Sequence, residues 1–507
     1  MNTNIYNVFT DHFPADLSST FIETEDGQTW SYADLDNESA RLARYLTESG
    51  VKKGERVAVQ VEKTPQALFL YMACLRAGFI YLPLNTAYTE SELAYFIDNA
   101  EPAVVVCRSS SLSGFQKIAR GKSVRHFYTL DNAPEHNLLQ LSETTSPQFE
   151  TAPCDKDDVA VILYTSGTTG RPKGAMITHG NLAANGLALK EIWGFSQDDV
   201  LLHALPIFHI HGLFVACHCT LLSGSKMLFI PRFNAETVTQ LLPRASVLMG
   251  VPTFYTRLLD NPAFTSTVCS NMRLFVSGSA PLLEQTFTEF QQRTGHTILE
   301  RYGMTETGMN TSNPLDGERK SGTVGHPLPG VTARIVDDEG QPLARNSVGN
   351  LQVKGDNVFI GYWRMPDKTA EEFTPDGFFK TGDMATLDED GYISIVGRGK
   401  DMVITGGFNV YPKEIELEID EQDGVIESAV IGIPHPDFGE AVTAIVTHDA
   451  SNTTCTEENI IAALKPRLAN YKIPKRILFV DELPRNTMGK VQKNVLRETY
   501  ANLFTEK

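Results

Sequence analysis

The chain has 507 residues, more than one hydrophobic core usually organises, so the sequence predicts at least two folding units. Acidic residues outnumber basic ones by 62 to 44, and the formal net charge of -18 argues against a nucleic acid or an anionic membrane as a partner. No apolar run reaches the roughly 18 residues of a membrane span, the N-terminal segment lacks the apolar stretch of a signal peptide, and the seven cysteines are scattered; these features predict a cytoplasmic protein.

Strand-like and helix-like segments alternate over the first four fifths of the chain. Prolines follow two of the predicted strands, and we expect Pro252 and Pro281 in the first turn of a helix. The alternation predicts an α/β fold, in layers around a mostly parallel sheet. The predicted strands are residues 56–61, 79–84, 159–164, 200–205, 247–251 and 274–277, and an apolar helix is predicted at 64–78.

The character of the sequence changes after Gly322. Short strands separated by turn residues predict a small β-rich subdomain over about 322–396. A run of glycines and charges at 397–401 then precedes a segment of mixed β and α character. We therefore expect a large N-terminal domain, residues 1–398, built of layered α/β subdomains, and a small α+β C-terminal domain, residues 399–507.

A loop rich in hydroxyls and glycines follows the predicted strand 159–164 directly. Such a turn exposes backbone amides to an anion, and Lys173 adds a positive charge, so the loop predicts polyphosphate binding. It is not a Walker A loop, because Lys173 is followed by Gly174 and not by Ser or Thr. Its candidate phosphate ligands are Thr165, Ser166, Gly167, Thr168, Thr169 and Gly170.

Six segments, in chain order, resemble the motifs of the adenylate-forming superfamily, which includes acyl-CoA synthetases, luciferases and peptide-synthetase adenylation domains. The resemblance covers nearly the whole chain. It implies a ligase that uses ATP, Mg²⁺ and CoA and joins a carboxylic acid to a thiol through an acyl-adenylate. The segments are 164–174, 209–212, 302–306, 381–383, 397–401 and 484–490.

The resemblance implies a nucleotide site. Glu306 is a hard oxygen ligand suited to Mg²⁺, and the Asp383 carboxylate is suited to accept hydrogen bonds from both ribose hydroxyls. Arg398 is expected on the ribose or α-phosphate side. Gly278, Ser279 and Ala280 form a turn beneath the adenine ring, and Glu300, Tyr302, Gly303 and Thr305 complete the site.

Lys490 is the expected catalytic lysine, with Thr305 and His209 beside it. When the carboxylate attacks the α-phosphorus, a lysine that bridges the two groups aligns them and offsets the developing negative charge. By resemblance, the C-terminal domain then rotates about Lys400, and Gly406 and Gly407 line the passage for the pantetheine arm of CoA. No serine or cysteine nucleophile is required.

Two arginines in pocket-forming segments, Arg257 and Arg301, suggest an acid with a second carboxylate. Each could instead pair with an acidic residue of the protein. The surrounding stretches resemble the malonyl-CoA synthetase subfamily, which implies that Arg257 contacts the distal carboxylate of malonate and that Arg301 also takes part. By the same resemblance His209 and Ser277 complete the pocket; whether methylmalonate is also accepted stays open. On this basis Arg257→Ala should cost malonate at least roughly 2–5 kcal/mol in kcat/KM.

Two alternatives remain at this stage. The first is an acyl-CoA synthetase for another small or aryl monocarboxylate. The second is a free-standing adenylation enzyme that loads a carrier protein. The sequence does not indicate an oligomeric state or a pathway.

Overall fold

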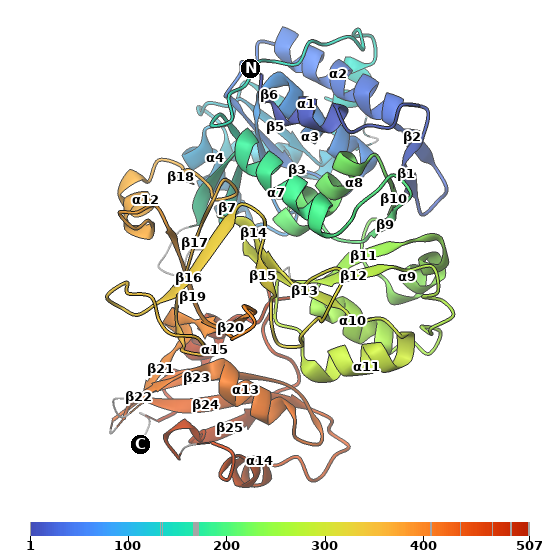
Figure 1. The fold of residues 1–507 in the computed structure, drawn as a ribbon. Helices are drawn as coiled ribbons and strands as arrows, with labels where there is room; N and C mark the ends of the chain where they lie inside the picture. Colours follow the sequence, from blue (N-terminus) through green and yellow to red (C-terminus); the bar gives the residue numbers. More distant parts are fainter. Residues whose placement is uncertain are drawn as a thin grey trace.

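The computed structural model describes residues 2–131, 133, 135–165, 172–405, 408–436, 438–468, 470–486 and 489–504. Figure 1 shows a large N-terminal part, blue to yellow, above a smaller C-terminal part, orange to red. Within the described ranges, no helix is long and apolar enough to cross a membrane. The predicted α/β fold with a large N-terminal and a small C-terminal part is confirmed.

Two large mixed sheets organise the N-terminal part. Their interiors are parallel, as predicted: β3 pairs with β4 and β5, and β11 pairs with β9 and β12. Antiparallel strands extend the edges. One sheet has the order β15 (His326–Pro327), β14 (Gly308–Ser312), β13 (Leu299–Met304), β12 (Leu274–Ser277), β11 (Val247–Gly250), β9 (Val200–His203), β10 (Lys226–Phe229), β1 (Thr20–Thr24), β2 (Thr29–Ser31). The other has the order β18 (Gly361–Tyr362), β8 (Lys173–Thr178), β7 (Val159–Thr165), β4 (Ile80–Pro83), β3 (Arg56–Gln60), β5 (Val104–Cys107), β6 (His126–Thr129).

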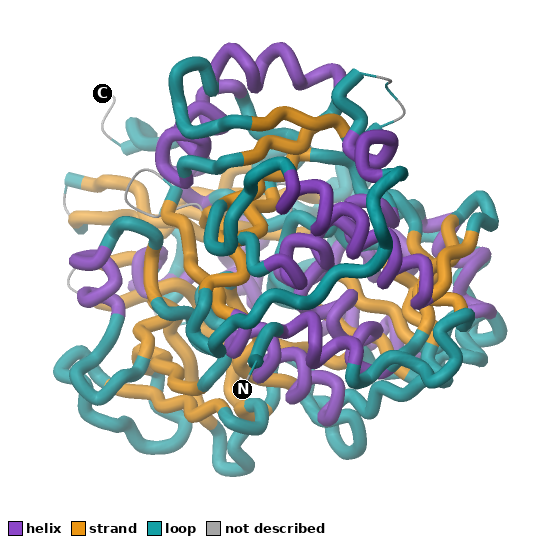
Figure 2. Tube along the Cα trace, turned by 90° about the horizontal axis from the view of Figure 1, so that it is seen from above, coloured by secondary structure: helices purple, strands orange, loops and turns teal. Residues whose placement is uncertain are grey.

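Helices fill the space between the two sheets and cover their outer faces. Figure 2 shows the helices and strands of the molecule from above. One hydrophobic core combines side chains of both sheets with those of the middle helices. The middle helices are α1 (Ile5–Thr10), α2 (Tyr32–Glu48), α3 (Pro65–Ala77), α6 (Leu138–Ser142), α7 (His179–Ile192) and α8 (His218–Ser223); the outer ones are α4 (Glu90–Ala100) and α5 (Leu112–Ile118) on one sheet, and α9 (Ala235–Leu241), α10 (Pro252–Leu259) and α11 (Glu284–Thr294) on the other.

Helix α3 shows how local sequence fixes these elements. Thr64 caps its N-terminus by accepting a hydrogen bond from the Ala67 amide, Pro65 occupies the first turn, and Gly78 ends the helix in the left-handed conformation. Residues 67–77 are buried on all sides, as a helix between two sheets requires. The predicted helix over 64–78 is therefore confirmed.

The prediction for Pro252 is confirmed and that for Pro281 is wrong. Pro252 is the first residue of α10, whereas α11 begins only at Glu284. The chain between β12 and α11 forms an irregular turn in which Ser279 has a φ of 74°, so helix formation is delayed. This turn lies beside the candidate site, where its backbone approaches Arg301 closely.

Two smaller sheets follow. The first is β16 (Val331–Val336), β17 (Gly349–Gly355), β19 (Phe379–Leu387) and β20 (Ile393–Arg398), with α12 (Pro366–Glu372) between β18 and β19. A short 3₁₀ turn, η4 (Gly399–Asp401), leads into the C-terminal part. There the sheet is β22 (Phe408–Val410), β21 (Val403–Thr405), β24 (Gly439–His448), β23 (Val425–His435) and β25 (Arg476–Phe479), with helices α13 (Pro412–Asp420), α14 (Glu457–Leu464) and α15 (Lys493–Thr499).

Candidate functional site

The guanidinium group of Arg301 lies in the interior of the N-terminal part. Arg301 is on β13 and only 3% exposed. It packs flat against the turn after β12: a Cβ atom added to Gly278 would lie 2.4 Å from Arg301 Cζ. Glycine at 278 is therefore what allows the arginine to occupy this place. Burial lowers the pKa of Arg301 to about 9, so the group is still charged at neutral pH.

Several polar atoms around Arg301 are buried without a hydrogen-bond partner in the described part of the chain. They are Arg301 Nε and Nη2, Ser277 Oγ and His211 Nε2. A buried guanidinium without a counter-ion costs several kcal/mol, and native proteins rarely leave such donors unmet. The cluster thus has the composition of an anion-binding site.

His209 and His211 reach this cluster from a short segment after β9. That segment leads into a π-helical turn, η2 (His211–Cys217), a geometry that is often found at functional sites. Burial first, and then the charges of Arg301 and Lys490, lower the pKa of His209 to about 4. His209 is therefore neutral at physiological pH and lies within electrostatic reach of both cations.

Lys490 enters the site from the C-terminal part. Its backbone amide donates to Asn486 Oδ1 at 3.0 Å, and Asn486 N donates to Lys490 O at 2.9 Å, which makes a tight hairpin. A Cβ atom on the preceding Gly489 would lie 3.5 Å from Thr253 Oγ1 at the start of α10. The Lys490 side chain is accessible, but it faces the space between the two parts rather than open solvent. Desolvation there lowers the pKa of Lys490, and Arg398 lowers it further.

The carboxylate of Asp383 and the guanidinium of Arg398 lie within electrostatic reach of Lys490. Asp383 is 4% exposed; its Oδ1 accepts from Arg398 Nε at 2.7 Å, and its Oδ2 accepts from the Tyr302 hydroxyl. Each of these oxygens keeps a second lone pair for a further donor. Burial by itself would lower the pKa of Arg398. The electrostatic influence of Asp383 and Tyr302 outweighs burial, so the pKa of Arg398 is raised. The predicted residues Tyr302, Asp383 and Arg398 are thus in direct contact.

Glu306 is buried next to Thr165, the first of the predicted phosphate ligands. Thr165 Oγ1 donates to Glu306 Oε1 at 3.4 Å, and the Tyr362 hydroxyl donates to the same oxygen at 3.0 Å. Lys173 lies on β8, 3.6 Å from Glu372. The other predicted phosphate ligands, Ser166, Gly167, Thr168, Thr169 and Gly170, lie outside the described residues.

Gly303 near the end of β13 and Thr305 directly after this strand lie in the same region. Thr305 lines a small cavity with Gly308 and Ile210. Gly308 has a φ of 62°, and a Cβ atom there would lie 2.6 Å from Asn185 Oδ1. Both the backbone conformation and the contact with Asn185 therefore require glycine at 308.

Glu300 does not join Arg301, although the two are adjacent in sequence. Successive residues of a strand point to opposite faces, so Glu300 is buried on the other side of β13. Burial raises the pKa of Glu300 to about 8, and Oε1 has no partner within the described residues. A contact between its side chain and the nucleotide stays a prediction.

Replacement of Glu300 by glutamine should make the protein less sensitive to alkaline pH. Because its pKa is about 8 in the folded protein and near 4.5 unfolded, the stabilising extra proton is lost as pH rises between these values. The slope is at most about 1.4 kcal/mol per pH unit. We expect the variant to gain about 3 kcal/mol over the wild type between pH 5.5 and 8, measured by thermal denaturation; parallel pH profiles would contradict the assignment.

Arg257 is not part of the buried cluster. Its side chain is exposed on α10, one helical turn beyond Thr253 and on the same face. This face approaches the hairpin of Lys490, so Arg257 lies toward the entrance of the site rather than in its interior. The contact of Arg257 with a substrate carboxylate stays a prediction. The pivot at the exposed Lys400 also stays a prediction. Gly406 and Gly407, the predicted passage for CoA, lie outside the described residues.

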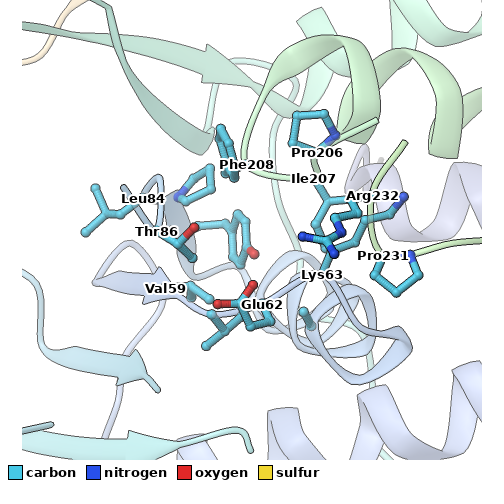
Figure 3. A pocket seen from close by; sticks show the side chains of 14 residues that line it. Val59, Glu62, Lys63, Leu84, Thr86, Pro206, Ile207, Phe208, Pro231 and Arg232 are labelled. Carbon is cyan, nitrogen blue, oxygen red and sulfur yellow. The ribbon is translucent and has the colours of Figure 1, made fainter. Parts of the chain in front are cut away.

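A second hollow, of about 220 Å³, opens at the carboxyl ends of β3 and β4 (Figure 3). Lys63 lies at its wall and donates to His203 Nδ1, His203 O and Ile230 O at 2.7–2.8 Å. His203 Nε2 in turn bonds Gly212 O at 2.9 Å. Lys63 thereby fixes the segment that carries His209 and His211.

Sequence reasoning missed the residues that support the site. Besides Lys63, Arg485 pairs with Glu427 and donates from Nη1 to Gly489 O at 2.6 Å, which holds the hairpin of Lys490. Tyr362 contacts Glu306 and Lys173. None of these residues carries a local sequence signal for its contact, because every contact depends on elements far apart in the chain.

Comparison with known proteins identifies the family. Residues 11–363 match the model of the AMP-binding enzyme family, and residues 414–490 match the AMP-binding enzyme C-terminal domain. The chain belongs to the AMP-binding enzyme family. The prediction of an adenylate-forming enzyme is confirmed.

Individual relatives narrow the comparison. A malonate–CoA ligase of Arabidopsis thaliana is 34% identical, over 94% of this chain and 86% of the relative, and a feruloyl-CoA synthase of an Amycolatopsis species is 34% identical over 94% of each. Crystal structures of MatB from Rhodopseudomonas palustris are 54% identical over 100% of both chains, with a TM-score of 0.97 for the ATP-bound form and 0.85 for the apo form. The arrangement described here is thus closer to the ATP-bound form.

Proposed function

We propose that this protein is a malonate–CoA ligase that forms malonyl-AMP and pyrophosphate from malonate and ATP, and then malonyl-CoA and AMP. The observation that carries the proposal is Arg301, a buried and charged guanidinium without a counter-ion among the described residues. The AMP-forming acid–thiol ligase chemistry agrees with the family, and the malonate specificity agrees with the Arabidopsis relative.

The site has two cations, one for each carboxylate of a diacid. His209 lies within electrostatic reach of both cations, since Arg301 and Lys490 each lower its pKa. The distal carboxylate would accept hydrogen bonds from Arg301 and Ser277, which have unmet donors. The reacting carboxylate would lie near Lys490. A monocarboxylic acid would leave Arg301 unpaired, so the same residue both selects malonate and penalises monoacids.

Adenylation follows from this placement. Lys490 bridges the reacting carboxylate and the α-phosphate, the carboxylate oxygen attacks the α-phosphorus, and pyrophosphate leaves. Asp383 holds the ribose hydroxyls through its remaining lone pairs, and the turn 278–280 lies under the adenine. The neutral His209 adds no third positive charge, so the field of the two cations stays directed at the two carboxylates.

Glu306 fits a Mg²⁺ ion bound together with ATP. In the described ranges no group of three or more His, Cys, Asp or Glu side chains could hold a metal ion by itself. Mg²⁺ is commonly held by one or two carboxylates plus substrate phosphates, which suits a single buried glutamate beside the phosphate loop. Both hydrogen bonds described for the carboxylate end on Oε1, which leaves Oε2 for the ion. Bound there, Mg²⁺ would offset the phosphate charge.

Thioester formation requires CoA to reach the adenylate carbonyl. Lys490 lies within electrostatic reach of His209 and Arg398, which supports a role in adenylation, so we propose that residues 399–507 then rotate about Lys400 as a mobile domain relative to 1–398. Lys400 lies in η4, between the last strand of one sheet and the first strand of the next. Gly406 and Gly407 would then line the pantetheine passage.

A proline at Lys400 should separate the two half-reactions. Proline fixes φ and so prevents the backbone change that a pivot needs. We expect Lys400→Pro to release one equivalent of pyrophosphate per enzyme at close to the wild-type rate but to form malonyl-CoA at least about tenfold more slowly. Pyrophosphate release and thioester formation are measured separately; unchanged overall turnover would contradict the pivot.

Two alternatives are tested directly. The feruloyl-CoA synthase relative keeps an aryl-acid ligase as the second candidate, and a pyrophosphate-release assay with malonate, acetate, butyrate and coumarate separates the two. A carrier-loading enzyme would not require CoA for product formation. Dependence of the thioester product on CoA therefore distinguishes it.

A further inference from the structure

Tyr362 reaches the nucleotide site from a strand that is remote in sequence. The two-residue strand β18 pairs antiparallel with β8, with Tyr362 opposite Ala175. Trp363 N donates to Gly174 O at 2.7 Å and extends this pairing to the start of β8, where Lys173 lies. A segment almost two hundred residues further along the chain is thus fastened to the strand that follows the phosphate loop.

The Tyr362 side chain contacts two groups of opposite charge at once. It is 3% exposed. Its hydroxyl donates to Glu306 Oε1 at 3.0 Å, and Lys173 Nζ lies 4.2 Å from the centre of its ring. One residue therefore touches both the carboxylate proposed for Mg²⁺ and the lysine of the phosphate loop.

Each contact leaves its partner free to bind a ligand. The hydroxyl engages only Oε1 of Glu306, so Oε2 stays available to a cation. The ring attracts the ammonium group through its electron-rich face and accepts no N–H in the manner of a carboxylate, so the lysine keeps donors for a phosphate.

The backbone around Tyr362 holds the ring in place. Tyr362 N donates to Thr369 Oγ1 at 2.9 Å, and Gly361 has a φ of 137°, where a Cβ atom would lie 2.5 Å from Thr369 Cγ2. Phe359 N donates to Glu306 O at 2.8 Å, which ties the same segment to the glutamate. The ring and the carboxylate are therefore fixed relative to each other before any ligand binds.

We propose that Tyr362 is a positioning residue that couples Mg²⁺ binding to phosphate binding, by orienting Glu306 through its hydroxyl and Lys173 through its ring. The proposal rests on the proposed function for ATP and Mg²⁺ but not on the identity of the acid. It divides the side chain into two separable parts. The hydroxyl serves the ion, and the ring serves the lysine.

The test is equilibrium binding of ATP to the full-length protein, by titration calorimetry, with and without Mg²⁺. For Tyr362→Phe we expect unchanged affinity without Mg²⁺ and a loss of about tenfold in the gain that Mg²⁺ provides, because a hydrogen bond to a charged group is removed. For Tyr362→Leu we expect, in addition, a loss of about fivefold without Mg²⁺, because the cation–π contact is gone.

Tyr392 provides a matched control. Its hydroxyl donates to Glu318 O at 2.8 Å and Lys320 Nζ lies 4.3 Å from its ring, in the β-rich unit and away from the site. Tyr392→Phe and Tyr392→Leu should leave both affinities at wild-type values.

A Tyr362→Phe variant with a wild-type gain from Mg²⁺ would overturn the proposal, and so would a wild-type protein that binds ATP equally well with and without the ion. If Tyr362→Leu does not fold, as judged by thermal melting, Tyr362→Phe decides alone. Because no acid is present, failure to use malonate would leave these results unaffected.

Discussion

Replacement of Lys490 by alanine is expected to lower the rate of adenylation by on the order of 10²–10³-fold or more and to leave thioester formation from supplied malonyl-AMP largely intact. The reason lies in its position. Lys490 projects from a hairpin of the C-terminal part into the space beside His209 and Arg398. On the proposed mechanism it offsets charge on the α-phosphate only while that hairpin occupies the site, during the first half-reaction.

The measurement separates the half-reactions. Pyrophosphate exchange with malonate and ATP reports the first, and formation of malonyl-CoA from synthetic malonyl-AMP reports the second. Lys475→Ala is the control, since Lys475 is an exposed lysine of the same domain that lies 5.0 Å from the Phe438 ring. Equal losses in both half-reactions of Lys490→Ala would remove it as the adenylation lysine.

Replacement of Arg301 by methionine should lower kcat/KM for malonate by about 10²–10⁴-fold, the effect of removing one partner of a buried charge pair. Methionine keeps most of the volume and removes both the charge and the donors. ATP affinity, measured by titration calorimetry, should change little, since in the proposed function Arg301 binds the acid and makes no contact with ATP. The penalty against a monoacid should also fall, so acetate or butyrate gains relative to malonate.

Arg301→Lys tests whether a positive charge alone binds the distal carboxylate or whether two parallel N–H donors are also needed. Lysine keeps the positive charge but cannot offer two parallel N–H donors to one carboxylate, so an intermediate loss is expected. Ser277→Ala should cost less than either variant, because it removes a single neutral donor. Malonate kinetics at the wild-type level in Arg301→Met would show that the distal carboxylate binds elsewhere, and the exposed Arg257 would then be the next residue to replace.

The order of the motifs, and with it the fold, could be predicted from the sequence because each motif joins a strand to a turn with characteristic residues. Helix α3 was predicted to within a residue at each end, since Thr64, Pro65 and Gly78 mark its limits. The helix after β12 was not, because Pro281 follows a turn whose shape depends on Arg301 from another strand. Local signals fail where a tertiary contact sets the backbone.

The residues of the acyl pocket could not be predicted fully either, because tertiary contacts decide which side chains point into it. The sequence offered both Arg257 and Arg301, and the resemblance favoured Arg257 for the distal carboxylate, because nothing local tells which guanidinium points inward. The alternation of β13 and the missing side chain at Gly278 bury Arg301, whereas Arg257 lies on the outer face of a helix. Tyr362 could not be predicted at all, because its two partners, Glu306 and Lys173, come from segments that the sequence does not connect.

The measurement that tests the central claim most directly is kcat/KM for malonate, acetate, butyrate and coumarate, with CoA included and omitted. The two-cation site predicts that malonate exceeds each monoacid by at least about 100-fold, since a monoacid leaves a buried arginine unpaired. It also predicts that malonyl-CoA and AMP accumulate only when CoA is present. A monoacid used as well as malonate, or better, would contradict the assignment of Arg301 as the residue that selects the substrate.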